Sequence, residues 1–250
     1  MIDLGDFKLY ARIKGEGSPT VIFENALGGT ANFIEPIQEK LSEFTKVVIY
    51  DRAGGGKSEK SPHSRTSSQM AKELHLLLEK GKITPPYILV GSSYGAFIVR
   101  TFTHLYPEEV VGMVLEEPVH EDLLPEMKKI RTEEQWQEYI GVMNQMAAMA
   151  PEGPKQEWAQ YFPNSDFVRE INFPNDIPIT IFTSTRYGEQ EQQMSYLQED
   201  INKKLELHKQ WMIGKPNMEH ITTEKSGHNI LQYESELVID AITNIINKAR

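Results

Sequence analysis

The feature that most constrains the fold is a series of short apolar runs that alternate with longer segments of helical spacing. Runs such as VVIYD and YILVG are apolar throughout rather than at every second position, which is typical of parallel strands covered on both faces. The expected strands are Lys8–Ile13, Thr20–Glu24, Lys46–Asp51, Tyr87–Gly91, Val111–Glu116, Pro178–Thr183 and Glu219–Thr223. The expected helices are residues 31–44, 66–80, 94–106, 189–211 and 233–249. This alternation predicts an α/β fold with a mostly parallel central sheet and helices on both faces.

One long segment interrupts the alternation. Residues 118–176 contain no convincing strand, only helical spacing broken by prolines and a glycine. We therefore expect a helical insert at 118–176 that lies over a core domain made of residues 1–117 and 177–250.

The central helix of this insert is expected to have one apolar face. Trp136, Ile140, Met143 and Met146 follow one another at spacings of four, three and three, with Met149 following, which places them on one side of a helix. Packing of this face onto the core is the simplest interpretation. Because methionine side chains adapt to irregular shapes, the same face can also line a pocket for an apolar group.

Charge and cysteine content argue against several classes of function. The 250 residues carry a formal net charge of −10 and show no clustered basic patch, so we expect no nucleic-acid partner. Cysteine is absent, which excludes disulfides, thiolate metal sites and a cysteine nucleophile. Histidines and carboxylates do not occur at metal-ligand spacings such as H-E-x-x-H, so no metal site is expected.

Two further expectations concern location. The N-terminal stretch MIDLGDFKLYARIKGEG has no basic start followed by an apolar core, and it therefore does not resemble a signal peptide. No run of about 18 apolar residues occurs, so no membrane-spanning helix is expected. Together with the absence of cysteine, these features agree with a cytoplasmic protein.

The motif with the clearest chemical meaning is GSSYG, residues 91–95. It fits the pattern G-x-S-x-G with Ser93 at its centre, directly after the strand YILV and before the helical stretch AFIVRTFTHLY. A sharp strand-to-helix turn forces the central serine into a strained backbone conformation, and Gly91 and Gly95 remove β-carbons that would clash there. Ser93 is therefore the predicted nucleophile, whereas Ser92 is out of register with the glycines.

A serine hydroxyl needs a base that accepts its proton and an acid that orients the base. Of the seven histidines, His228 is the one that lies in a loop after a late strand and before the last helix, in the context KSGHNIL. Its place late in the chain agrees with the order serine, acid, histidine of serine nucleophiles on open α/β sheets. His228 is the predicted base.

The same chemistry needs backbone N–H groups that stabilise a tetrahedral oxyanion. One predicted donor is the amide of Tyr94, which directly follows the nucleophile. The second is expected in the loop NALGG after the strand TVIFE, because its small residues let the backbone approach a substrate. Leu27 is the predicted donor in that loop.

Taken together, these motifs resemble those of the α/β-hydrolase superfamily over almost the whole chain. NALGG takes the place of the family's His-Gly-x-Gly oxyanion loop, DRAGGGKS that of its Asp-Arg-x-Gly-x-Gly-x-Ser segment, GSSYG that of the nucleophile elbow and SGHNI that of the histidine loop. The insert falls where such enzymes carry a cap domain. Asn25 and Ala26 depart from the usual His-Gly of the oxyanion loop.

The acid of the triad has more than one candidate in the sequence. In many relatives an aspartate follows the strand that here reads IPITIFTS, but this chain continues TRYGEQEQQ and has no aspartate before Asp200. Glu117, at the end of the preceding strand, matches the place where related families put their acid and is the preferred candidate. Glu116, Glu189 and Glu191 are the alternatives.

The segment DRAGGGKS, residues 51–58, looks at first like a phosphate-binding loop. The pattern G-x-x-x-x-G-K-[ST] would place its first glycine at position 51, which is Asp51. A helix should also begin at once, whereas a polar loop containing Pro62 follows. The glycines instead predict a tight turn beside the oxyanion loop, in which Asp51 and Arg52 fix local structure.

These residues predict a serine hydrolase that cleaves an ester or similar acyl bond of a small, partly apolar substrate through an acyl-enzyme. The same residues would also serve an amide or peptide hydrolase of this fold. A different class of function, a small-molecule binding protein without turnover, would suit the altered oxyanion loop and the unusual acid. Dehalogenase and epoxide hydrolase chemistry in this superfamily uses an aspartate nucleophile, so Ser93 argues against both. The predicted chemistry needs no cofactor.

Overall fold

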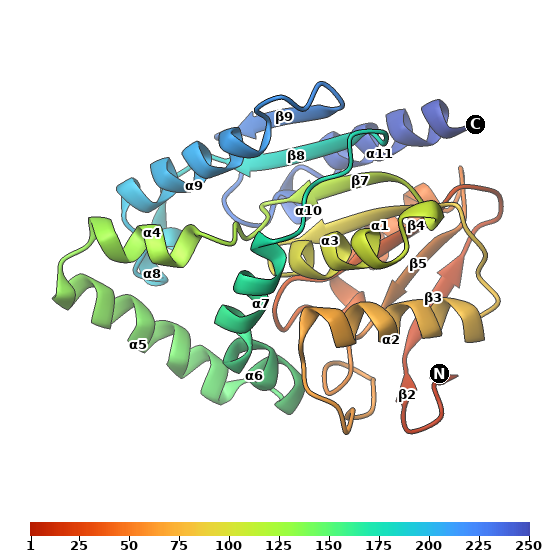
Figure 1. Ribbon diagram of the computed structural model, residues 1–250, viewed down its shortest axis with the longest axis horizontal. Helices are drawn as coiled ribbons and strands as arrows, with labels where there is room; N and C mark the ends of the chain where they lie inside the picture. The colour runs from red at the N-terminus through yellow and green to blue at the C-terminus, as the bar shows by residue number, and fades with distance from the viewer.

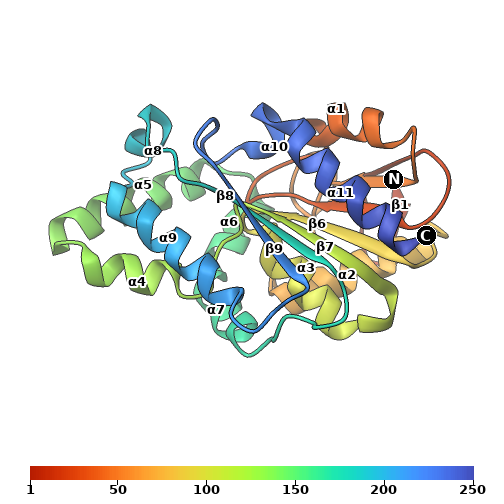
Figure 2. The ribbon, with the colours of Figure 1, turned by 90° about the horizontal axis from the view of Figure 1, so that it is seen from above.

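The computed structural model describes residues 1–250 and contains a seven-stranded sheet covered by helices on both faces (Figures 1 and 2). Its strands, in the order in which they lie across the sheet, are β3 (Ala11–Lys14), β5 (Val47–Tyr50), β4 (Thr20–Glu24), β6 (Tyr87–Ser92), β7 (Val110–Glu116), β8 (Ile179–Ser184) and β9 (Met218–Thr223). Only β3 runs antiparallel to its neighbour, β5. The α/β fold with a mostly parallel sheet, predicted from the alternation of apolar runs, is confirmed.

The two faces of the sheet are covered by different helices. One apolar cluster lies between the sheet and α2 (Ser67–Lys80) and α3 (Gly95–Leu105). The other lies between the sheet and α1 (Ala31–Leu41) and α11 (Ser235–Ala249), on the opposite side in Figure 2. Because both faces are covered, all residues of β4 and β5 are buried, which explains why these strands are apolar almost without alternation.

Four helices follow β7 before the chain returns to the sheet in β8. They are α4 (Leu123–Ile130), α5 (Glu133–Met149), α6 (Glu152–Ala159) and α7 (Tyr161–Arg169). Thr132 and Gln135 form a capping box that begins α5. These helices lie beyond the carboxyl ends of the strands (Figure 1). Of the four, α4 packs against α9 (Gln198–Trp211), which follows the short helix α8 (Glu189–Gln193), and α7 packs against α3.

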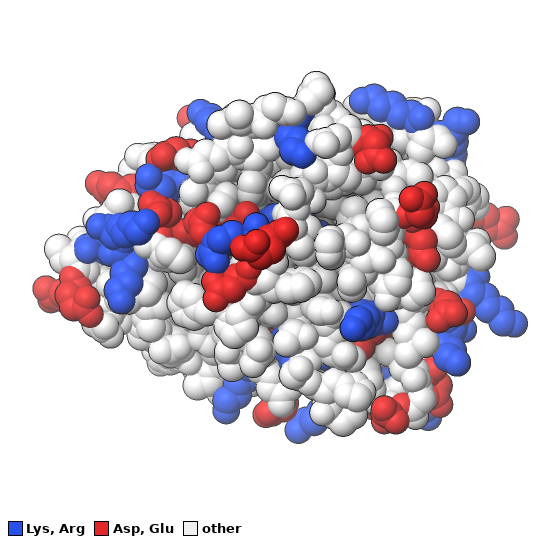
Figure 3. All heavy atoms as spheres, viewed as in Figure 1, with Lys and Arg blue, Asp and Glu red and all other residues white.

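The remaining elements are short. A separate two-stranded sheet holds β1 (Ile2–Asp3) and β2 (Lys8–Leu9), η1 (Pro107–Glu109) precedes β7, and α10 (Ile230–Tyr233) precedes α11. None of the helices is long and apolar enough to span a bilayer. On the face shown in Figure 3, basic and acidic side chains are interspersed rather than gathered into a basic patch.

The prediction of one strand over Lys8–Ile13 is wrong. Leu9 pairs with Ile2 in the small sheet, whereas Ala11 pairs with Tyr50 in the large one. Between them, the N–H of Tyr10 donates to the Ser58 hydroxyl instead of to a strand. The segment is therefore shared between two sheets.

The prediction of one helix over 189–211 is also wrong, because the chain breaks between α8 and α9. Ser195 adopts a φ of +55°, in the left-handed region, which a continuing right-handed helix does not allow. The Asp200 carboxylate then accepts the N–H of Leu197 at the start of α9 and pairs with the buried Arg131. A tertiary ion pair therefore helps to set where the second helix begins.

The turn from β6 into α3 depends on two glycines. A Cβ atom at Gly95 would lie 2.4 Å from the carbonyl oxygen of Glu24, and one at Gly91 would lie 2.7 Å from Cγ2 of Val99. Both distances are far shorter than a normal contact, and one of the opposing atoms is backbone. Helix α3 can therefore pack directly against the strands only because these two positions lack side chains.

This packing predicts that Gly95→Ala lowers the free energy of unfolding by about 1–3 kcal/mol, because the added methyl group overpacks a backbone contact. Gly141→Ala is the matched control, since nothing lies within 4 Å of the added carbon and the site is inside α5. It should raise the free energy of unfolding by about 0.5–1 kcal/mol. Urea denaturation measures both changes, and equal effects of the two substitutions would contradict the packing argument.

Candidate functional site

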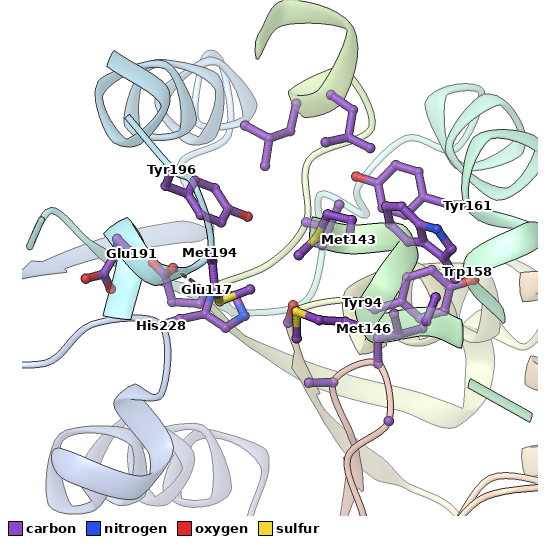
Figure 4. A pocket seen from close by; sticks show the side chains of 18 of the residues that line it. Tyr94, Glu117, Met143, Met146, Trp158, Tyr161, Glu191, Met194, Tyr196 and His228 are labelled. Atoms are coloured by element: carbon purple, nitrogen blue, oxygen red, sulfur yellow. Dashed lines mark hydrogen bonds and ion pairs between the residues drawn. The ribbon is translucent and has the colours of Figure 1, made fainter. Parts of the chain in front are cut away.

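The residues singled out from the sequence meet at the carboxyl ends of the strands. Leu27 follows β4, Ser93 follows β6, Glu117 follows β7 and His228 follows β9. All four line one cavity of about 370 Å³, whose wall also includes residues of the helices that follow β7. Figure 4 shows Glu117 and His228 side by side in this cavity. Residues from distant parts of the sequence therefore share one site, because parallel strands end at the same edge of the sheet.

Ser93 lies in a strained turn. Its φ of +50° is in the left-handed region, which costs a residue with a Cβ atom about 1–3 kcal/mol. The surrounding backbone holds it there: its N–H donates to the Glu116 carbonyl at 2.9 Å, and its carbonyl accepts the N–H groups of Ala96 and Val119. The side chain is largely buried but lines the cavity, and no hydrogen bond joins its hydroxyl to His228.

Glu117 is the carboxylate that contacts His228. Its Oε2 lies 3.2 Å from Nδ1 of His228 and also accepts a hydrogen bond of 2.6 Å from Nζ of Lys204. Its Oε1 accepts the backbone N–H of Ser184 at the end of β8. The carboxylate itself is fully buried. One carboxylate therefore joins residues from β7, β8, α9 and the loop after β9.

The charges of Glu117, Lys204 and His228 shift the pKa values of Glu117 and His228. Burial alone would raise the pKa of Glu117, but the charge of Lys204 and the contact with His228 outweigh it and lower the pKa to about 2. Burial lowers the pKa of His228, but its hydrogen bond to Glu117 and the charge of that carboxylate outweigh burial and raise the pKa above the usual 6.5. Lys204 opposes this rise in the pKa of His228.

The other three carboxylates considered from the sequence have different contacts. Glu116 accepts hydrogen bonds from the Ser92 hydroxyl and the N–H of Leu231, and burial raises its pKa. Glu191 accepts the N–H of Gly188 at the start of α8, and Glu189 is exposed. None of these three makes a hydrogen bond to His228.

Two residues that line the cavity have a backbone amide without a partner. Leu27 and Tyr94 both line it, and neither of their N–H groups donates a hydrogen bond within the protein. Tyr94 is buried and Leu27 is partly buried, and backbone N–H groups away from water are nearly always paired, so two free ones beside a strained serine are a feature that a ligand oxygen could satisfy.

The DRAGGGKS segment lies beside this site and not in it. The Asp51 carboxylate accepts the N–H groups of Ala31 and Lys57, at 2.7 and 2.8 Å. Arg52 is buried against the loop that holds Leu27. Neither residue lines the cavity, and both hold neighbouring backbone in place.

Most of the cavity wall is apolar and comes from helices whose contribution the sequence did not reveal. Of its 26 lining residues, 16 are hydrophobic. Met143 and Met146, expected on one face of α5, do line it, whereas Met149 is 81% exposed. Residues that sequence reasoning missed include Tyr139, Trp158, Tyr161, Met194, Tyr196 and Lys204. Only the folded arrangement of α5 to α9 brings them together.

No cluster of three or more histidine, cysteine, aspartate or glutamate residues has the arrangement of a metal site. The polar groups of the cavity include the serine, the histidine with its carboxylate, Lys204 and the free amides. They can supply a nucleophile, a proton acceptor and two donors to an anionic oxygen.

A family model described as alpha/beta hydrolase fold matches residues 19–141. YqjL, an uncharacterised protein of Bacillus subtilis, is 29% identical over 238 residues, which are 93% of this chain and 85% of that protein. Further curated relatives match 41–54% of this chain, which spans only 17–41% of their length.

Solved structures with the same architecture include two esterases. A thermophilic esterase from Thermogutta terrifontis superposes with a TM-score of 0.64 at 16% identity, over 97% of this chain and 94% of that one. An esterase from Exiguobacterium antarcticum superposes with a TM-score of 0.62 at 16% identity, over 96% of both chains. Likeness at this level of identity shows the fold.

The contacts of Glu117 predict how His228 titrates. In an NMR titration, the imidazole of His228 should change protonation at a pH above 6.5. Lys204→Met should move this midpoint further upward, because it removes a positive charge that disfavours the imidazolium. Lys203→Met, which removes a charge paired with Glu206 on the same helix, is the control and should leave the midpoint in place. A downward shift in Lys204→Met would contradict the assignment of these contacts.

Proposed function

The chain belongs to the α/β-hydrolase superfamily, and from this premise we propose that it is a hydrolase that cleaves a carboxylic ester or similar acyl bond through a Ser93–His228–Glu117 triad. The observation that carries the proposal is the contact between His228 and the buried, ionised Glu117 in the same cavity as the strained Ser93. A serine, an imidazole and a carboxylate in these places are the parts that acyl transfer requires.

In the proposed mechanism, Oγ of Ser93 attacks the carbonyl carbon of the substrate while its proton moves to Nε2 of His228. Nε2 is free for this role because Nδ1 faces Glu117, and that contact selects the imidazole tautomer with its proton on Nδ1. The buried carboxylate then stabilises the imidazolium that forms.

The tetrahedral intermediate carries its negative charge on the former carbonyl oxygen. The free N–H groups of Leu27 and Tyr94 donate to this oxygen in the proposal, and their orientation is established before the reaction. The intermediate collapses as the bond to the leaving alcohol breaks and His228 returns the proton to that alcohol. Water then repeats the sequence on the acyl-enzyme, which releases the acid and frees Ser93.

The cavity favours a small substrate with an apolar acyl group. Met143, Met146, Trp158 and Tyr161 form its wall on the side of the helices that follow β7 (Figure 4). We assign residues 118–176 the role of a cap that provides this wall and shields the intermediate from water. The names of the two esterases of like fold support an ester as the substrate, and the thioether side chains would adapt to acyl chains of different shape.

A second candidate function is small-molecule binding without turnover. It is favoured by the absence of a hydrogen bond between the Ser93 hydroxyl and His228, since an active serine needs that proton path. A binding protein would use the same apolar cavity but would not form an acyl-enzyme. Labelling of Ser93 and turnover of esters separate the two functions.

Ser93→Ala should abolish both labelling by a fluorophosphonate probe and hydrolysis of p-nitrophenyl esters, because no other hydroxyl occupies the centre of the turn. Ser92→Ala is the control and should retain both, since the Ser92 hydroxyl donates to Glu116 instead of lying free in the cavity. A panel of esters of increasing acyl length measures how far the apolar wall extends. A wild-type protein that is inert toward the probe and the whole panel would favour the binding function.

Glu117→Gln should reduce kcat by about 10²–10⁴-fold, because an amide cannot stabilise the imidazolium or hold its tautomer as a carboxylate does. Glu116→Gln and Glu191→Gln are the matched controls and should lower kcat far less. Lys204 loses its ionic partner in Glu117→Gln, so the folding of this variant needs a check. Circular dichroism provides that check for each variant. Undiminished turnover in this variant, with a loss in one of the controls, would reassign the acid.

A further inference from the structure

The side chain of Arg52 connects three parts of the molecule that meet beside the site. It is 7% exposed, and each of its five N–H donors has an acceptor. The acceptors are Glu24 Oε1 at 2.6 Å, the Asn25 carbonyl at 2.6 Å, the Ala26 carbonyl at 2.9 Å, and Glu157 Oε1 and Oε2 at 2.8 and 2.7 Å. Arg52 therefore joins the end of β4, the loop with Leu27 and helix α6.

Two hydrogen bonds to the Ala26 carbonyl, from Arg52 at 2.9 Å and from the N–H of Gly29 at 3.0 Å, set which way the next amide points. In a trans peptide, the C=O of one residue and the N–H of the following residue lie in one plane and point in opposite directions. The C=O of Ala26 points at Arg52, so the N–H of Leu27 points away from Arg52. This N–H has no acceptor in the protein, and Leu27 lines the cavity.

Glu157 in turn holds the guanidinium of Arg52. Its carboxylate accepts two parallel hydrogen bonds, a bidentate geometry that fixes the plane of the guanidinium as well as its position. Glu157 is 1% exposed and lies 105 residues from Arg52 in the chain, on a helix of the segment that follows β7. One of the two hydrogen bonds that orient the Leu27 amide therefore depends on a side chain from that segment, whereas the other, from Gly29, is local.

A second contact anchors α6 independently of this ion pair. The N–H of Gly153 donates to the Gly54 carbonyl at 3.2 Å. A Cβ atom at Gly54 would lie 2.7 Å from the Gly153 nitrogen, and one at Gly153 would lie 2.2 Å from the Ala53 carbonyl oxygen. Helix α6 therefore packs against the turn formed by DRAGGGKS. A change at Glu157 leaves this backbone contact in place.

We propose that Arg52 and Glu157 are positioning residues through which α6 holds the Leu27 amide in the orientation that binds the oxyanion. This inference rests on the proposed function, because it assigns the Leu27 N–H the role of a donor to the tetrahedral intermediate. It gives the DRAGGGKS segment a part in the reaction although the Arg52 side chain does not reach the cavity.

The test is Glu157→Gln, with Glu152→Gln as the matched control on the same helix. The substitution at Glu157 keeps the size of the side chain but removes its charge and one of its two acceptors, whereas Glu152 is exposed and bonds only Gln156. Glu157→Gln should lower kcat on a p-nitrophenyl ester by about 10–100-fold, since complete removal of an oxyanion donor costs about 10²–10³-fold. The KM should change by less than about twofold, because uniform binding of the substrate is untouched.

A trifluoromethyl ketone analogue of the ester provides a readout that a purely structural role would not move. It forms a tetrahedral adduct with serine whose oxygen is anionic, so its inhibition constant should weaken by the same factor as kcat/KM in Glu157→Gln. Arg52→Lys, which keeps the charge but cannot hold both carbonyls and Glu157, should show the same proportional loss. Glu152→Gln should behave as the wild type in both assays.

The backbone ¹⁵N–¹H resonance of Leu27 is measured without any substrate. It should shift in Glu157→Gln and in Arg52→Lys and stay in place in Glu152→Gln. An unshifted Leu27 amide, or a Glu157→Gln enzyme with wild-type kcat, would overturn the inference even if the wild type hydrolyses esters. A wild type that hydrolyses no ester while the Leu27 amide shifts would instead overturn the proposed function. Loss of folding in both variants would assign the pair to stability alone and would also overturn the inference.

Discussion

The buried carboxylate of Glu117 is the interaction on which the arrangement of the site depends. It follows β7 and binds the backbone of β8, a lysine from α9 and the histidine after β9. Without this carboxylate, the positions of these segments at the edge of the sheet would be less constrained. A buried charge must be paired and hydrogen-bonded, so burying one carboxylate here requires the other three segments to converge on it.

A second buried ionic group, on the other side of the sheet's centre, also holds a loop of the site in place. Glu24 ends β4, and it binds Arg52 together with Glu157. The group around Glu117 holds the histidine, and the group around Arg52 holds the loop that precedes α1. Both recruit a residue from a helix beyond the strand ends, Lys204 in one case and Glu157 in the other. In the proposed function, Ser93 reacts between two sets of groups whose positions are set before a substrate arrives.

The local sequence was sufficient to predict those features of the structure that depend on residues close together in the chain. The GSSYG turn could be predicted because its glycines are needed for contacts that any strand-to-helix turn of this shape makes, and the positive φ of Ser93 follows from that shape. The apolar runs identified the strands of the parallel sheet for the same reason, since burial on both faces leaves few polar positions. His228 was predicted from its loop and its place late in the chain, and Glu117 was preferred because its position after a strand matches the place where related families put their acid.

The sequence by itself therefore determined the fold class and the candidate serine and histidine, and it narrowed the carboxylate to four residues, because strand burial and turn geometry are properties of short segments. Only the tertiary structure decided which of Glu116, Glu117, Glu189 and Glu191 contacts His228, and that Lys204 shares that carboxylate. It also decided the break between α8 and α9, where Asp200 binds Arg131, and the contact of Glu157 with Arg52. These contacts join residues 69 to 111 positions apart, and no local pattern encodes which distant partner a buried charge will meet.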